Sequence, residues 1–346
     1  MPRGEAAMNG ETINTGRSWH APGGGTRRAL LGIAGAACAA ATAQAQRPAW
    51  PTQPIRFIGI FPPGGGTDIL SRIWCNRMAE VTGQSFVVEN RSGSGGNVGT
   101  EAIARATPDG NTIGLASVSS LSIAPTLYPR LPYDVERDFS YICGLWQLPN
   151  LLIVRHGIPA HSVPELITLC RREPGRYSFG SSGAGTTLHI AGEMFKHMGQ
   201  VNILHVPYRG GAQAYNDLLG GRVDMVFGNI PEALRLSREG QVRPLAVTGA
   251  ARSPQAPEVP AMAEFLPGYE INSWGGVLGP AGIQTAIVER IAEVGREAVE
   301  SAEVRRRFEE AGATVWWTPP AGLAEFRREN ETRFAPLVRA SGARVE

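Results

Sequence analysis

Residues 55–74 read IRFIGIFPPGGGTDILSRIW. The apolar, β-branched run at 55–60 is typical of a buried strand, and the proline- and glycine-rich residues 62–68 end it. From Ile69 to Trp74 the apolar residues recur at helical spacing. We therefore expect a strand, a glycine-rich loop and a helix, with backbone N–H groups of the loop at the start of the helix, where anions bind.

The same pattern recurs in the next fifty residues. A strand-like run at 86–89 precedes a glycine-rich loop at 90–97 and a helix at 98–106, and a third strand follows at 112–116. Strands that alternate with helices at this spacing predict a parallel α/β sheet.

A second set of elements begins with an apolar strand at 151–154. Ser162 and Glu165 form a capping box that opens a helix. A strand at 177–180 then leads into a Ser-, Gly- and Thr-rich loop at 181–187 and a helix at 188–198. Further strands are expected at 203–206, 225–227 and 276–278, and further helices at 213–219, 287–299, 302–310 and 323–338.

The first 45 residues predict an export signal that is removed from the mature protein. Arg27 and Arg28 precede an uncharged, alanine-rich stretch at 29–45 that is too short for a stable membrane span and ends in two small-x-small cleavage sites. The paired arginines resemble a twin-arginine signal, although Sec export stays open. A lipid anchor at Cys38 and an alanine-rich helix of the domain are the alternatives. The signal places the protein in the periplasm.

Composition excludes several classes of protein. The 346 residues favour two domains. With 33 Lys and Arg against 31 Asp and Glu, only one lysine (Lys196) and no long basic run, the chain lacks the positive surface that a nucleic-acid-binding protein needs. The mature chain keeps Cys75, Cys143 and Cys170, an odd number without a C-x-x-C pair, and the histidines form no metal-binding motif. We therefore expect buried thiols, and no metal or cofactor.

The loops do not match common catalytic or nucleotide-binding motifs. Ile69 stands where the third glycine of a dinucleotide-binding fingerprint belongs, and a phosphate-binding loop would need a lysine. The chain has no G-x-S-x-G nucleophile elbow. His189 would serve as a general base only beside a nucleophile, and a core histidine is the simpler interpretation. Two α/β lobes with backbone donors at helix starts instead describe a binding protein that closes over a small anion.

Several short motifs resemble the Bug (Bordetella uptake gene) family, the extracytoplasmic solute-binding proteins of tripartite tricarboxylate transporters. They are PIR at 54–56, FPPGG at 61–65 with Asp68, VVENR at 87–91, GGN at 95–97, PDG at 108–110, LPYD at 131–134, DF at 138–139, HVPY at 205–208 and SW at 273–274 with Gly276. The chain departs from the family pattern at Ser92, Gly228 and residues 283–284. Of these, Gly228 falls at the expected cleft.

The resemblance implies a two-lobed periplasmic-binding-protein fold of type II, each lobe a mostly parallel sheet flanked by helices, joined by hinge strands. Residues 46–153 with 274–346 would form lobe 1, and residues 154–273 lobe 2. It implies a carboxylate ligand held mainly by two loops, and the residues that match them are Gly64, Gly65, Gly66, Thr67, Asp68, Ser181, Ser182, Gly183, Ala184, Gly185, Thr186, Thr187 and His189. Further expected cleft residues are Ser117, Ser119, Tyr208, Phe227 and Asn229.

The predicted function is that of a periplasmic receptor, not an enzyme. It would capture a small organic acid and deliver it, as a monomer, to the membrane permease subunits of a tripartite transporter. One alternative is a periplasmic receptor that senses the ligand for a signalling partner, since it would need the same closed form. An α/β hydrolase-type enzyme is the alternative from another class of protein. The sequence leaves open which acid is bound. A site that contacts its ligand mainly through backbone N–H groups has few side chains that identify the ligand.

Overall fold

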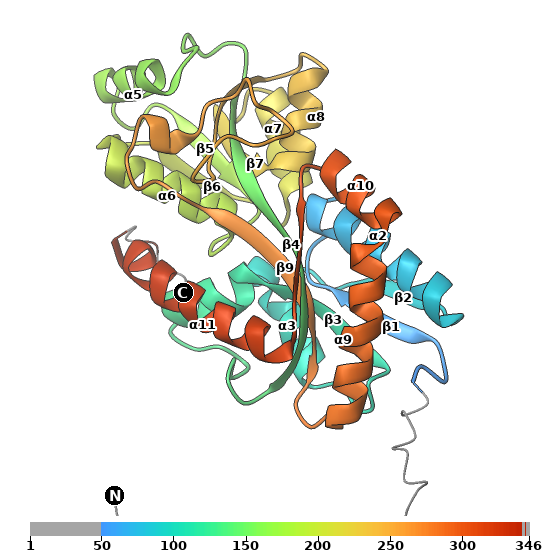
Figure 1. Ribbon diagram of the computed structural model, residues 1–346. Helices are drawn as coiled ribbons and strands as arrows, with labels where there is room; N and C mark the ends of the chain where they lie inside the picture. The colour runs from blue at the N-terminus through green and yellow to red at the C-terminus, as the bar shows by residue number, and fades with distance from the viewer. Residues whose placement is uncertain (1–49, 341–342, 344–346) are drawn as a thin grey trace, which may run out of the picture. The chain divides into compact units, whose positions relative to one another are not determined.

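The computed structural model describes residues 50–340 and residue 343 (Figure 1). The predicted export signal lies outside these residues. Among the helices of residues 50–340, none is both long and apolar enough to cross a membrane.

The chain alternates strands and helices over most of its length. The strands are β1 (Ile55–Gly59), β2 (Phe86–Asn90), β3 (Thr112–Ser117), β4 (Phe139–Val154), β5 (Ser178–Ser181), β6 (Leu204–Pro207), β7 (Met225–Asn229), β8 (Arg243–Val247), β9 (Asn272–Pro280) and β10 (Thr314–Thr318). The longer helices are α2 (Gly66–Thr82), α3 (Asn97–Ala104), α5 (Val163–Arg172), α6 (Thr187–Gly199), α7 (Gly211–Leu219), α8 (Ile230–Arg238), α9 (Thr285–Glu300), α10 (Ala302–Glu310) and α11 (Pro320–Ala340). Short helical segments are η1 (Ser94–Gly96), η2 (Ser119–Ile123), α4 (Ala124–Leu127) and η3 (Met262–Glu264).

The first set of strands surrounds β1. It pairs in parallel with β2 and β3, and three of its side chains, those of Ile55, Phe57 and Ile58, are completely buried because helices cover both faces of the sheet. The antiparallel strand β9 lies beside β3, and β4 lies beside β9. The predicted strand, loop and helix of residues 55–74 are therefore confirmed.

The second set of strands surrounds β5, which pairs in parallel with β6 and β7. The last five residues of β4 pair with β7 and β8, whereas its earlier residues pair with β9 and β10. Strands β4 and β9 run side by side through the centre of the fold (Figure 1). The predicted α/β class is confirmed, and these two strands add antiparallel pairings that make the sheet mixed.

Strand β4 is much longer than the strand expected at 151–154. Its register against β9 shifts between Tyr141 and Cys143 and again between Gly144 and Trp146. Each irregularity moves the following side chains to the other face, so the two-residue alternation that identifies a strand is lost from the sequence.

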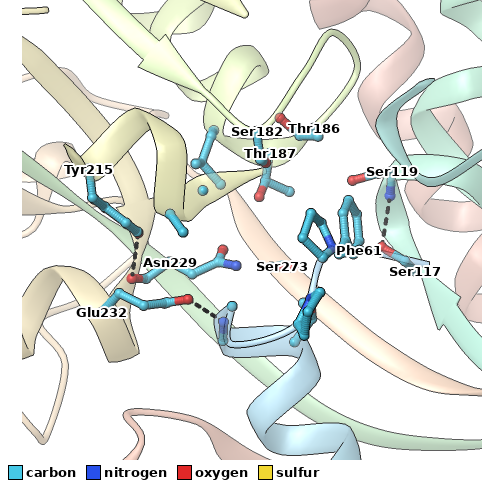
Figure 2. A pocket seen from close by; sticks show the side chains of 18 residues that line it. Phe61, Ser117, Ser119, Ser182, Thr186, Thr187, Tyr215, Asn229, Glu232 and Ser273 are labelled. Carbon is cyan, nitrogen blue, oxygen red and sulfur yellow. Dashed lines mark hydrogen bonds between the residues drawn. The ribbon is translucent and has the colours of Figure 1, made fainter. Parts of the chain in front are cut away.

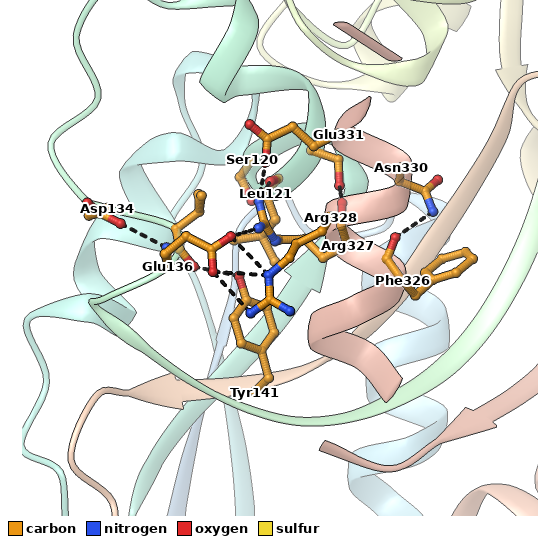
Figure 3. A network of polar contacts seen from close by, with 12 residues as sticks. Ser120, Leu121, Asp134, Glu136, Tyr141, Phe326, Arg327, Arg328, Asn330 and Glu331 are labelled. Carbon is orange, nitrogen blue, oxygen red and sulfur yellow. Dashed lines mark hydrogen bonds and ion pairs between the residues drawn. The ribbon is translucent and has the colours of Figure 1, made fainter. Parts of the chain in front are cut away.

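A buried arginine anchors α11 to η2 and to the loop before β4 (Figure 3). The side chain of Arg327 is 1% exposed and forms ion pairs with Glu136 and Glu331. Its Nη1 also donates to the carbonyl oxygen of Leu121 at 3.5 Å, and the hydroxyl of Ser122 donates to the carbonyl oxygen of Arg327 at 3.0 Å. The network therefore joins α11, η2 and the loop before β4.

The three cysteines of the mature chain, Cys75, Cys143 and Cys170, are buried and unpaired, as the sequence predicted. Burial raises the pKa of Cys143 and of Cys170 to about 12. These thiols therefore stay protonated and act as small apolar side chains.

Candidate ligand-binding site

A pocket forms where the starts of four helices meet the ends of several strands (Figure 2). It lies between the β1–α2 loop, the end of β3, the β5–α6 loop, the starts of α7 and α8, and β9. Its lining is Phe61, Pro62, Pro63, Gly65, Gly66, Thr67, Ser117, Ser119, Ser182, Thr186, Thr187, Leu188, Gly211, Ala212, Tyr215, Asn229, Glu232 and Ser273. Within the described residues, this lining contains no lysine, arginine or histidine.

The start of α6 presents backbone donors to the pocket. Thr186 is its N-cap, and the Thr186 hydroxyl oxygen accepts from the N–H of His189 at 3.4 Å. Gly185 donates its own N–H to Nδ1 of His189 at 3.1 Å. The amides of Thr187 and Leu188 belong to the first turn, whose N–H groups have no acceptor within the helix, and both residues line the pocket. This helix start suits an anion.

The start of α2 is organised by Asp68, whose side chain turns away from the pocket. Its carboxylate accepts from the N–H of Gly64 at 2.9 Å, from Arg72 at 2.9 Å and from Asn90 at 2.8 Å. Burial alone would raise the pKa of Asp68, but these hydrogen bonds from Arg72, Asn90 and Gly64 lower it below its usual value. Asp68 thus holds the glycine-rich loop in shape.

Glu232, in the first turn of α8, is the only acidic side chain among the described residues that line the pocket. One carboxylate oxygen, Oε1, accepts from the N–H of Gly66, so it joins the start of α8 to the start of α2 (Figure 2). The other oxygen is shielded from solvent and has no hydrogen-bond partner among the described residues. Burial raises the pKa of Glu232 to about 7, although backbone N–H groups donate to it.

Gly228, one of the positions where the chain departs from the Bug family pattern, has a steric explanation. A Cβ atom at Gly228 would lie 2.3 Å from the hydroxyl oxygen of Tyr215. That hydroxyl donates to the carbonyl oxygen of Asn229 at 3.4 Å. The Tyr215 ring thus fills the space that a side chain at position 228 would need.

Half of the residues predicted from the sequence line this pocket. They are Gly65, Gly66, Thr67, Ser117, Ser119, Ser182, Thr186, Thr187 and Asn229.

The other half do not line the pocket. They are Gly64, Asp68, Ser181, Gly183, Ala184, Gly185, His189, Tyr208 and Phe227. Tyr208 donates its hydroxyl to Asp217 at 2.7 Å, and Phe227 is fully buried in the core. The Ser181 hydroxyl shares a hydrogen bond of 2.7 Å with Nε2 of His205.

His189 stacks on His205 beneath the β5–α6 loop. Their ring centroids are 4.0 Å apart, and the His205 ring also stacks on Phe179. Burial, helped by the neighbouring His205 and Lys196, lowers the pKa of His189 to about 3, and burial with Lys196 lowers that of His205 to about 4. Both rings are therefore neutral, and His189 accepts a hydrogen bond from the loop.

This pair predicts a loss of stability in acid. Below about pH 6.5 the unfolded chain takes up protons on both histidines, whereas the folded chain does not until about pH 4, so the free energy of unfolding falls as the pH falls through this window. From pH 7 to pH 5, we expect the unfolding free energy of the wild type to fall by about 2 kcal/mol more than that of His205→Phe, which lacks one of the two histidines. Urea unfolding of both proteins measures it, and parallel pH profiles would contradict it.

Sequence reasoning missed half of the lining. The missed residues are Phe61, Pro62, Pro63, Leu188, Gly211, Ala212, Tyr215, Glu232 and Ser273. The starts of α7 and α8 carry a signal that was available, since Gly210 precedes α7, and Asn229, Pro231 and Glu232 form a typical helix start after a strand.

Comparison with known proteins gives consistent matches over most of the chain. The sequence profile described as "Tripartite tricarboxylate transporter family receptor" matches residues 70–343. Protein BugT of Bordetella pertussis is 33% identical over 86% of this chain and 92% of its own length.

Two solved structures are similar in both fold and sequence. Rpa4515 of R. palustris with adipate has a TM-score of 0.83 and 34% identity, covering 86% of this chain and all of its own. MatC (Rpa3494) of Rhodopseudomonas palustris with bound malate has a TM-score of 0.79 and 28% identity, covering 84% of this chain and all of its own.

Proposed function

Because this chain belongs to the tripartite tricarboxylate transporter receptor family, we propose that its pocket captures a small organic acid, which the receptor then delivers to a tripartite-type permease. The resemblance to the Bug family and the two-lobed α/β fold are confirmed by the relatives. Those relatives are binding proteins and receptors, so the prediction that the chain is not an enzyme is also confirmed. Adipate and malate, bound in two similar structures, are both dicarboxylates.

The observation that carries the proposal is the start of α6. Thr187 and Leu188, whose amides belong to the first turn of α6, line a pocket with no basic side chain among its described lining residues. A carboxylate seated there would receive two N–H donors and the positive end of the helix dipole. Hydroxyls of Ser117, Ser119 and Ser182 surround the same space (Figure 2) and could bind it directly or through water.

We propose that the two lobes comprise residues 46–153 with 274–346, and residues 154–273. The change of partners along β4 supports this division, because β4 pairs with β9 up to Pro149, with β7 from Asn150 and with β8 from Leu151. The pocket draws residues from both proposed lobes, so bending of β4 and β9 would open it and a ligand would favour the closed form.

We also propose a periplasmic location, with export by the signal in residues 1–45. The family membership supports it, since a receptor for a membrane permease must meet its ligand outside the cytoplasmic membrane. The permease subunits are the proposed partners.

A thermal-shift screen tests the proposed function. The protein from residue 46 onward is unfolded, dialysed to remove bound ligand and refolded, then heated with mono-, di- and tricarboxylates and with amino acids. We expect at least one of these acids to raise the Tm by about 3 °C or more at a concentration far above its Kd, because ligand binds only the folded state. The matching uncharged amides serve as controls, and a screen without any shift would contradict the proposal.

A further inference from the structure

Two hydrogen-bond acceptors on pocket-lining residues have no donor within the part of the chain that the structure describes. They are Oε2 of Glu232 and the side-chain oxygen of Asn229, and both atoms are shielded from solvent. Asn229 precedes α8 and Glu232 follows three residues later, so the two side chains lie on one face of the helix start, as Figure 2 shows. Buried acceptors without donors are rare and costly in native proteins.

The Glu232 carboxylate is held in a fixed position. Its Oε1 accepts from Gly66, and a Cβ atom at Gly66 would lie only 2.8 Å from Oε2, so the start of α2 packs directly on it. The side chain therefore has no room to move its free oxygen toward another donor at this loop.

Burial raises the pKa of Glu232 by more than Arg235 of α8 lowers it. On α8 itself, Arg235 pairs with Glu239 at 2.8 Å. Arg238, also on α8, and Glu310 of α10 border the groove on the outer side of Glu232. Tyr215 of α7 lines the same pocket as Glu232, and α2 contributes Gly66, Thr67 and Ile69 to the surroundings of Glu232.

We infer that Glu232 and Asn229 select a ligand that carries an amino group beside its carboxylate. The ligand ammonium would donate to Oε2 of Glu232 and to the Asn229 side-chain oxygen, while its carboxylate meets the start of α6. This inference rests on the proposed function and narrows its ligand from organic acids in general to amino acids. An ammonium supplies the donors and the positive charge that the pocket lacks, whereas a plain dicarboxylate brings a second negative charge toward Glu232.

The inference fixes the sign of the pH dependence. Because burial raises the pKa of Glu232 to about 7, the carboxylate is partly protonated near neutrality. An ammonium binds the ionised form, so affinity for an amino acid rises as the pH increases through 7. A second carboxylate binds better to the protonated form, so its affinity falls over the same range.

Calorimetric titration with matched pairs tests the inference on ligand-stripped protein. Each pair differs by one amino group: succinate and aspartate, glutarate and glutamate, adipate and 2-aminoadipate, and 3-phenylpropionate and phenylalanine. In at least one pair we expect the amino acid to bind about tenfold more tightly at pH 8, with a smaller preference at pH 6. Glu232→Gln keeps an oxygen for Gly66 and should lose most of the preference. Glu258→Gln, a change in an exposed glutamate outside the pocket lining, should keep it.

The outcomes separate this inference from the function on which it rests. Tighter binding of the plain acids, with affinity that falls as the pH rises, would support the receptor function and overturn the role of Glu232. An amino-acid preference that Glu232→Gln leaves unchanged would also overturn that role. If no compound of any pair binds, the proposed function fails together with the inference.

Discussion

Replacing Thr187 with phenylalanine should weaken binding of the carboxylate ligand by about 100-fold or more. Thr187 is the first residue of α6, it is buried, and its side chain faces the pocket (Figure 2). A phenyl ring at this position occupies the space beside the amides of Thr187 and Leu188. The ligand would then have to displace the ring or leave the start of the helix, and either change costs binding free energy.

Thr285→Phe is the matched control. Thr285 is likewise the first residue of a long helix, α9, but it is exposed and does not line the pocket. Titration calorimetry of both variants with the acid that stabilises the wild type most measures the effect. Unchanged affinity in a folded Thr187→Phe protein would show that the ligand does not use the start of α6.

Replacing Arg327 with methionine should lower the free energy of unfolding by about 3 kcal/mol. Methionine keeps much of the packing volume, but it leaves the Glu136 and Glu331 carboxylates without their shared partner (Figure 3). Partial exposure of these two glutamates allows water to offset part of the loss. The expected cost therefore lies at the lower end of what breaking a buried ion pair causes.

Arg328→Met provides the comparison for this change. Arg328 neighbours Arg327 on α11 and pairs with the same Glu136 at 3.2 Å, but its side chain is 59% exposed. Exposed pairs contribute little, so this variant should unfold almost like the wild type. Urea denaturation measures the free energy of unfolding of the two variants. Equal stability of Arg327→Met and Arg328→Met would mean that the buried network does not anchor α11.

The sequence predicted the local α/β units well because each has an apolar strand, a glycine-rich loop and an amphipathic helix in direct succession. Residues 55–74 are the clearest example. Strand β4 was recognised only at its end, because its register shifts hide the alternation of its side chains. Strands β8 and β10 are short and gain their stability from pairing with β4, which no local pattern reveals.

The sequence predicted which loops form the site, but not which of their side chains point into it. Thr187 and His189 are two residues apart at the start of α6, yet Thr187 lines the pocket while His189 turns inward to Gly185 and His205. Asp68 likewise turns to Arg72 rather than to the cavity. Such directions depend on neighbours that are distant in sequence, as does the approach of Glu232 to Gly66, 166 residues away.

A crystal structure of the protein with the acid that stabilises it most would test the central claim most directly. We predict that the ligand carboxylate lies in the pocket, with an oxygen about 2.7–3.1 Å from the amide nitrogen of Thr187 or Leu188. The ligand should also touch residues from both proposed lobes, such as Ser119 and Asn229. A ligand bound elsewhere on the surface, with the start of α6 unoccupied, would contradict the account.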